Sequence, residues 1–82
     1  MSNDNWLNQN NCLTKEFIFQ NFKEALAFVN QVGEIAEANN HHPDILIYGY
    51  KKVKITLTTH SEGKVTDKDT EMAKLIDKSV SF

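Results

Sequence analysis

The chain has 82 residues, which allows one domain of ordinary size and excludes a large multi-domain enzyme. Nine basic and eleven acidic residues give a net charge of -2, and 24% charged with 40% hydrophobic residues is the balance of a globular protein. Intrinsic disorder and a membrane span are therefore not expected. All nine basic residues are lysines, so the chain lacks the planar guanidinium that contacts phosphate and guanine bidentately. This composition argues against direct binding of nucleic acid.

Cys12 is the only cysteine, so the chain cannot form an internal disulfide. A domain this small then needs either unusually efficient packing or association with further copies of itself. The first residues lack the basic segment and apolar run of a secretory signal, and no stretch approaches about 18 consecutive apolar residues. We therefore expect a cytoplasmic protein that does not enter a membrane.

Two strands are predicted at the start of the chain. Residues 13–19 are rich in β-branched and aromatic side chains, which is typical of a strand. Trp6 and Leu7 are expected to pair with this strand, because the run 8–11 between them contains three asparagines, which favour turns. The sequence thus predicts an N-terminal hairpin.

From Asn21 the apolar residues recur every three or four positions, which predicts a helix over residues 21–38. Asn21 and Glu24 have the spacing of a capping box at its start. Gly33 inside the helix costs about 1 kcal/mol relative to alanine. A close contact with another helix or backbone segment would explain its presence.

Residues 45–50 and 52–59 predict a second pair of strands. The second run alternates apolar residues with lysine and threonine, as in an antiparallel sheet with one buried face. The first run is apolar on both faces, which suggests burial by a second subunit, and Gly49 suggests a bulge. Thr66 and Asp69 then have the spacing of a capping box that starts a final helix.

The predicted order is two strands, a helix, two strands and a helix. This order predicts an α+β fold with a four-stranded antiparallel sheet covered on one face by helices. We expect a single domain over residues 1–82, with its core at about residues 6–80.

All three histidines are expected at one end of this sheet. His41 and His42 follow the first helix, and His60 ends the last strand. If the strands 45–50 and 52–59 form a hairpin, the start of one and the end of the other lie side by side. Because histidine exchanges protons near neutral pH, three converging imidazoles predict an acid/base site.

Other interpretations of these residues stay open. A single loop histidine is most often a solvated polar residue, and three imidazoles with a water can also bind zinc. The helical spacing usual for such a zinc site is absent here. Glu37 could be a solvated helix residue and Asp69 only a member of its capping box, or either could orient a histidine or bind a ligand.

The spacing of these residues resembles a known family motif. The run 37–43 (EANNHHP), then Tyr50, then Thr59 and His60, then Asp69 is similar to the signature of the pterin-4a-carbinolamine dehydratases. The aromatic pattern from Phe17 to Phe28 also resembles the strand-to-helix passage of that family, and Trp6 stands where a tryptophan is usual. The resemblance covers about residues 6–80.

The resemblance implies a specific reaction, the dehydration of 4a-hydroxytetrahydropterin to quinonoid dihydropterin. This reaction regenerates the cofactor of aromatic amino acid hydroxylases and needs neither a metal nor an organic cofactor of its own. The catalytic residues implied by position are His41, His42, His60 and Asp69. The implied substrate-binding residues are Glu37 and Thr59.

Members of this family are commonly dimers or dimers of dimers, so the resemblance also implies a homodimer or homotetramer. This agrees with the apolar strand and the missing disulfide. Two other functions stay open: a non-enzymatic dimerisation or assembly module on the same fold, and a metal-dependent hydrolase. The intact histidine trio favours the enzyme over the module.

Overall fold

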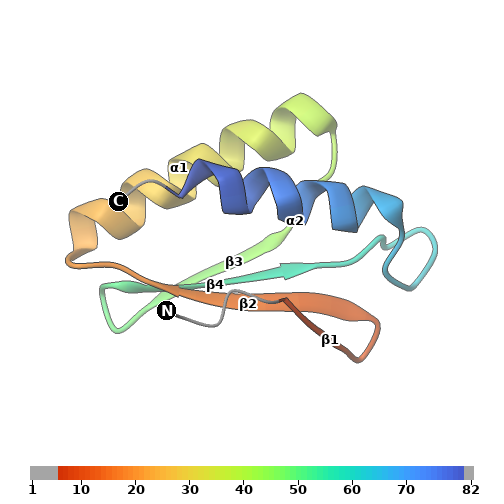
Figure 1. The fold of residues 1–82 in the computed structure, drawn as a ribbon, viewed down its shortest axis with the longest axis horizontal. Helices are drawn as coiled ribbons and strands as arrows, with labels where there is room; N and C mark the ends of the chain where they lie inside the picture. Colours follow the sequence, from red (N-terminus) through yellow and green to blue (C-terminus); the bar gives the residue numbers. More distant parts are fainter. Residues whose placement is uncertain (1–5, 81–82) are drawn as a thin grey trace.

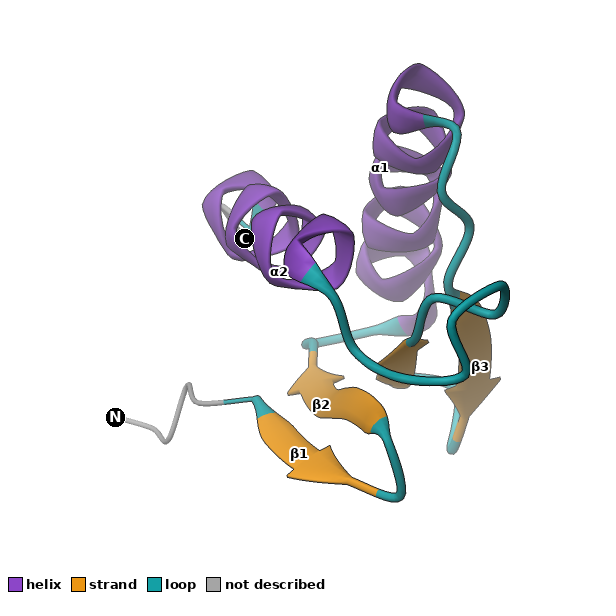
Figure 2. Ribbon diagram, turned by 90° about the vertical axis from the view of Figure 1, so that its right-hand side faces the viewer, coloured by secondary structure: helices purple, strands orange, loops and turns teal. Residues whose placement is uncertain are grey.

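The computed structural model describes residues 6–80, which form two strands, a helix, two strands and a helix (Figure 1). The elements are β1 (Leu7–Gln9), β2 (Cys12–Ile18), α1 (Phe22–Asn39), β3 (Asp44–Tyr48), β4 (Lys52–Leu57) and α2 (Asp67–Ser79). The strands form one antiparallel sheet in the order β1-β2-β4-β3, and both helices lie on the same side of it (Figure 2). The predicted α+β fold is confirmed.

The first hairpin is tighter than the sequence predicts. Asn10 and Asn11 alone form its turn, both with left-handed backbone at φ 53° and 62°. The pair Gln9 and Cys12 closes the ladder beside them, so residues 8 and 9 belong to the strand. Two consecutive left-handed residues match the twist of a two-residue hairpin, and asparagine tolerates that conformation best after glycine.

The second hairpin corrects the prediction of a bulge at Gly49. β3 ends at Tyr48, and both Gly49 and Tyr50 adopt left-handed backbone in the turn, at φ 56° and 53°. β4 ends at Leu57, two residues before the predicted end. The glycine therefore serves a tight reversal, which is the other common use of its conformational freedom.

The core lies between the sheet and the two helices. Every second residue of β4 points toward the helices and is almost completely buried, as the alternation predicts. The rings of Phe17 and Phe19 pack against Phe28 of α1, with centroid distances of 4.7 and 5.0 Å. From α2, Met72 and Ile76 complete this cluster.

The helix α1 begins and ends at the positions that its flanking asparagines predict. Its N-terminal cap differs from the predicted capping box in one hydrogen bond. Asn21 Oδ1 accepts from the backbone N–H of Glu24 at 2.8 Å, while the Glu24 side chain accepts from Gln20 N–H at 3.1 Å. A strict capping box would return that carboxylate to Asn21 itself. At the other end Asn40 is left-handed at φ 50°, the conformation that stops a helix.

Within residues 6–80, the expected close contact at Gly33 is absent. A β-carbon built at this position would meet nothing within 4 Å. The glycine instead lines an open groove beside α1, described below.

A buried lysine ties the sheet to α2. The Lys15 side chain is only 8% exposed, and its Nζ lies 2.8 Å from Asp77 Oδ1. Trp6 Nε1 donates to the other oxygen of the same carboxylate at 3.1 Å, and the Lys15 ammonium lies over the rings of Trp6 and Phe17. This cluster joins the start of the chain, β2 and the last turn of α2 without a disulfide.

No helix in residues 6–80 is long and apolar enough to cross a membrane.

The substitution Asp77→Ala removes the carboxylate that Lys15 and Trp6 share. We expect it to lower the free energy of unfolding by about 1–3 kcal/mol, since the lysine is buried but Asp77 is partly exposed. Urea denaturation measures the change. The matched control is Lys74→Ala, which removes an exposed ion pair at 3.9 Å and should change stability by less than about 0.5 kcal/mol. Equal effects of the two substitutions would contradict this account.

Candidate active site

Three chain segments meet at one end of the sheet. The register pairs Asp44, the first residue of β3, with Thr56 near the end of β4, so the segments before β3 and after β4 are neighbours. The first segment carries His41 and His42, and the second carries Thr59 and His60. The start of α2 reaches the same place, because the loop from β4 returns across this end of the sheet (Figure 2). The sequence-based expectation of a shared sheet end is thus matched by the topology.

His41 forms an ion-pair contact with Asp69. Its Nε2 lies 2.6 Å from Asp69 Oδ1, and the side chains are 12% and 0% exposed. The end of α1 sets this position, since the His41 N–H donates to the Ala36 carbonyl at 3.1 Å immediately after the left-handed Asn40. The pair therefore joins the exit of α1 to the first turn of α2.

The second oxygen of Asp69 is held from the other side. Asp69 Oδ2 accepts from the hydroxyl of Thr59 at 2.7 Å and from the backbone N–H of Thr66 at 2.9 Å. The contact with Thr66 is one half of the predicted capping box of α2, which is confirmed. The same carboxylate thus caps a helix and contacts a histidine, so the two sequence-based interpretations of Asp69 are compatible.

Competing effects act on the pKa of Asp69. Burial raises the pKa of this carboxyl group, but the hydrogen bonds from His41, the Thr66 N–H and Thr59 lower it by more. Attraction to the His41 ring in its protonated form acts in the same direction, and the net pKa lies below the ordinary value of 3.8. Asp69 is therefore ionised near neutral pH and can only accept hydrogen bonds.

An ionised Asp69 fixes the tautomer of a neutral His41. Because the carboxylate accepts, His41 Nε2 carries the proton, and Nδ1 has the free lone pair. His41 also lines a hollow of about 340 Å³ at the start of α2. The lining residues of this hollow are Asn39, His41, Asp67, Lys68, Glu71 and Met72. A base oriented by a buried carboxylate is the arrangement that general acid/base catalysis requires.

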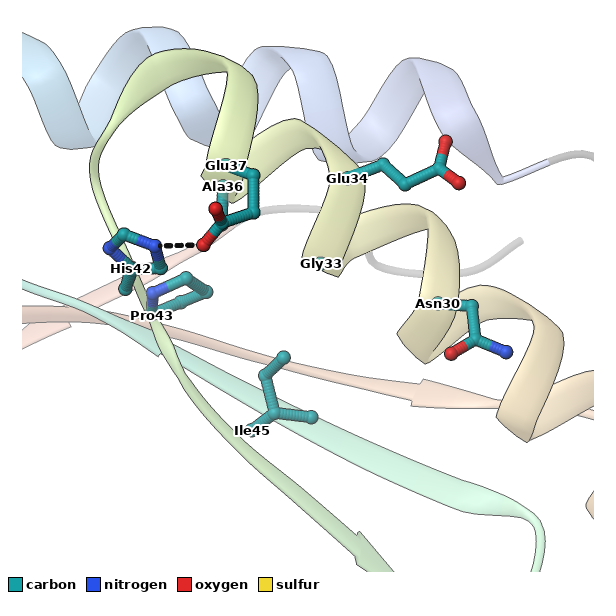
Figure 3. Close-up of a pocket in the computed structure, with 8 residues that line it drawn as sticks. All are labelled: Asn30, Gly33, Glu34, Ala36, Glu37, His42, Pro43 and Ile45. Atoms are coloured by element: carbon teal, nitrogen blue, oxygen red, sulfur yellow. Dashed lines mark hydrogen bonds and ion pairs between the residues drawn. The ribbon is translucent and has the colours of Figure 1, made fainter.

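His42 belongs to a second hollow. Its Nε2 lies 2.7 Å from Glu37 Oε2, but both side chains are exposed, at 56% and 80%. Figure 3 shows this pair at one end of an open groove of about 740 Å³ between α1 and β3. Pro43, Ile45 and Gly33 lie along the groove (Figure 3). The adjacent histidines therefore line different hollows, and each is paired with its own carboxylate.

His60 lies in the turn that follows β4. It is exposed, and within residues 6–80 its side chain makes no hydrogen bond. Its carbonyl accepts from Gly63 N–H at 3.2 Å, and an isolated bridge between Thr59 and Lys64 closes the turn. His60 thus stands one residue from Thr59, next to the Asp69 cluster, and lines neither of the two hollows.

Sequence reasoning found the histidines and carboxylates but gave Thr66 only a capping role. Thr66 Oγ1 lies 2.7 Å from Thr59 Oγ1, so this cap is part of the hydrogen-bond network around Asp69. The sequence did contain a signal for this role of Thr66. Asp69 belongs both to the capping box with Thr66 and to the spaced motif that resembles the family signature. Among residues 6–80 no cluster of three or more metal-ligating side chains is present.

Comparison with known proteins identifies the family of the chain. The family model described as pterin 4 alpha carbinolamine dehydratase matches residues 1–79. A protein of Sulfurisphaera tokodaii, provisionally named as a pterin-4-alpha-carbinolamine dehydratase, is 51% identical over 72 residues, or 88% of this chain and 76% of the relative. A similarly named protein of Prochlorococcus marinus is 43% identical over 96% of this chain and 82% of its own. The chain therefore belongs to the pterin-4a-carbinolamine dehydratase family.

Two solved structures share the fold. A transcriptional coactivator/pterin dehydratase from Brucella melitensis aligns with a TM-score of 0.80 and 34% identity, over 89% of this chain and 77% of that one. A pterin dehydratase-like protein identified as a RuBisCO assembly factor in the alpha-carboxysome aligns with a TM-score of 0.76 and 25% identity, over 90% and 87%. The fold thus occurs in proteins with more than one described role.

The lowered pKa of Asp69 predicts how stability depends on pH. A carboxylate whose pKa is depressed by folding stabilises the protein above its ordinary pKa of 3.8, and this contribution is lost as the pH falls through the folded value. The stability difference between the wild type and Asp69→Asn should therefore be largest near neutral pH and shrink below about pH 4. Urea denaturation at stepwise lower pH measures it. A difference that is independent of pH would contradict the ionised, hydrogen-bonded state of Asp69.

Proposed function

We propose that the protein dehydrates 4a-hydroxytetrahydropterin to quinonoid dihydropterin and so recycles the cofactor of aromatic amino acid hydroxylases. The observation that carries the proposal is the contact of His41 Nε2 with the buried, ionised Asp69, which leaves Nδ1 for a substrate. Membership of the dehydratase family supports the same reaction class, that of a hydro-lyase.

The reaction needs two proton transfers and no other reagent. The bond between C4a and the hydroxyl oxygen breaks, and that oxygen leaves as water after it receives a proton. The N5 proton is removed while the N5 lone pair forms the new double bond to C4a. A protonated histidine can supply the first proton and a neutral one can accept the second, each contributing about 10²–10⁴-fold. The chemistry requires neither a metal nor an organic cofactor.

We assign the two transfers to His41 and His60, with Asp69 acting on His41 through orientation and charge. Thr59, the chain neighbour of His60, donates at 2.7 Å to Asp69, the hydrogen-bond partner of His41, which supports a common site for the two histidines. His42 holds the pterin ring or its hydroxyl, and Glu37 orients His42 through the 2.7 Å contact.

The substitutions His41→Ala and His60→Ala should each reduce the rate of dehydration by about 10²–10⁴-fold, because each removes one proton-transfer group. The assay generates 4a-hydroxytetrahydropterin enzymatically and follows its loss by ultraviolet absorbance. Lys54→Ala, on the opposite face of the sheet, is the control and should keep the wild-type rate. The assignment fails if both histidine variants accelerate dehydration as the wild type does.

A second candidate function is a non-enzymatic assembly module. The structural neighbour described as a RuBisCO assembly factor favours this candidate, because it has the same fold at 25% identity. The same assay separates the two functions. Wild-type protein that leaves dehydration at the buffer rate would favour the module over the enzyme.

We also propose that the protein is a homodimer or homotetramer. β3 is an edge strand of the sheet, and it contains neither lysine nor proline, the residues that usually protect such an edge. Leu46 points away from the helices and is 54% exposed, and Ile45 on the other side is 36% exposed. A second copy that covers this strand would supply the burial that a domain of this size otherwise lacks.

Sedimentation at micromolar concentration should therefore show a dimer or a tetramer. The substitution Leu46→Lys places a charge on the exposed edge and should shift the equilibrium toward smaller species. Leu75 on α2 is also exposed, at 39%, and the substitution Leu75→Lys tests the helix surface in the same way. A wild-type protein that sediments as a stable monomer would refute this part of the proposal.

A further inference from the structure

The hydroxyl of Thr59 is a buried polar group to which the proton transfers above assign no role. Thr59 follows β4 and is only 4% exposed. Its Oγ1 lies 2.7 Å from both Asp69 Oδ2 and Thr66 Oγ1. Its backbone N–H and carbonyl are bonded within the 59–64 turn. Direct contact of Thr59 with a substrate stays a prediction, but its inward hydrogen bonds favour an indirect role.

The direction of each hydrogen bond in this cluster follows from the charge of Asp69. An ionised carboxylate only accepts, so Thr59 must donate its single hydroxyl proton to Asp69 Oδ2. The short contact between the two threonines then requires Thr66 to donate to Thr59. Thr66 Oγ1 in turn accepts from the backbone N–H of Lys68 at 3.3 Å. The bonds form one polarised chain that ends on Asp69.

This chain of hydrogen bonds determines which oxygen of Asp69 accepts from His41. Oδ2 receives two donors, the Thr59 hydroxyl and the Thr66 N–H, whereas Oδ1 receives only His41. Two donors from different segments fix the plane of the carboxylate and therefore the ring of the histidine. Without Thr59, Oδ2 keeps one donor, and the carboxylate is both more basic and freer to rotate.

We propose that Thr59 is a positioning residue of the dehydration site, which holds the Asp69 carboxylate in the orientation and charge state that present His41 Nδ1 to the substrate. The kinetic part of this inference rests on the proposed function. The structural part does not, because it concerns only the free protein.

The charged groups that line the same hollow as His41 are Asp67, Lys68 and Glu71, all from α2. All three belong to exposed residues. The other titratable groups close by in the chain or the proposed site are His42 with its partner Glu37, and His60. Asp69 is the group that contacts the ring from the buried side. A change at Thr59 therefore reaches His41 through Asp69, while the charges across the hollow stay as they are.

The test compares Thr59→Val, which removes the hydroxyl at nearly constant volume, with Thr59→Ser, which keeps it. Carbon NMR of the Asp69 carboxyl group in the free protein should show its pKa raised by about one unit in Thr59→Val. Thr59→Ser should stay close to the wild type. Loss of stability alone would leave the pKa of Asp69 in the folded protein unchanged.

Dehydration by Thr59→Val should be slower by about 10- to 100-fold, the effect of one hydrogen bond to a charged group. Thr59→Ser should restore both the rate of dehydration and the titration of Asp69. Thr58→Val is the matched control, because it removes a hydroxyl that donates to the Asn11 carbonyl at 2.8 Å, away from Asp69. This control should keep the wild-type carboxyl titration.

An unchanged Asp69 titration in folded Thr59→Val would overturn the inference, whatever the activity. A raised Asp69 pKa in Thr59→Val, found together with wild-type protein that leaves dehydration at the buffer rate, would uphold the hydrogen-bond role of Thr59 and refute the proposed function. If Thr59→Val does not fold, the wild-type protein provides the test. Its Thr59 side-chain resonances should shift as Asp69 titrates, and resonances that do not change during this titration would overturn the inference.

Discussion

The geometry of the candidate site depends on the hydrogen bonds that the Asp69 carboxylate accepts. It is completely buried, and it accepts hydrogen bonds from three segments: the exit of α1 through His41, the exit of β4 through Thr59, and the start of α2 through Thr66. A buried charge is tolerated only when it is paired and hydrogen-bonded, so these segments are constrained together. Helix capping and the orientation of the His41 ring are thus performed by one group.

Two further features of this chain of 82 residues hold the candidate site in place. The sheet supplies a rigid end, where the register of β3 and β4 brings the two histidine-bearing segments side by side. The cluster of Lys15, Trp6 and Asp77 anchors the far end of α2 to β2. With α2 held at both ends, its first turn can present Asp69 at a fixed position, and a proton transfer needs little more than such a fixed pair.

Much of the fold could be predicted from the sequence, because local patterns and tertiary packing agree. Alternation in β4, the helical period after Asn21 and the cap at Thr66 each specify one element. Gly49 was ambiguous, since glycine serves bulges and turns alike and only the length of the ladder decides between them. The open space at Gly33 could not be foreseen, because periodicity gives the face of a helix but not what lies opposite it. Spacing likewise indicated candidate site residues, but it could not show that His41 and His42 line separate hollows or that Thr59 bonds to Asp69.

The most direct test of the central claim is the nitrogen NMR spectrum of the His41 ring, recorded in the free wild-type protein at a pH where the ring is neutral. If Asp69 holds this histidine for proton transfer, the proton resides on Nε2 and Nδ1 shows the shift of an unprotonated nitrogen. The opposite tautomer, or an equal mixture of the two, would contradict the account.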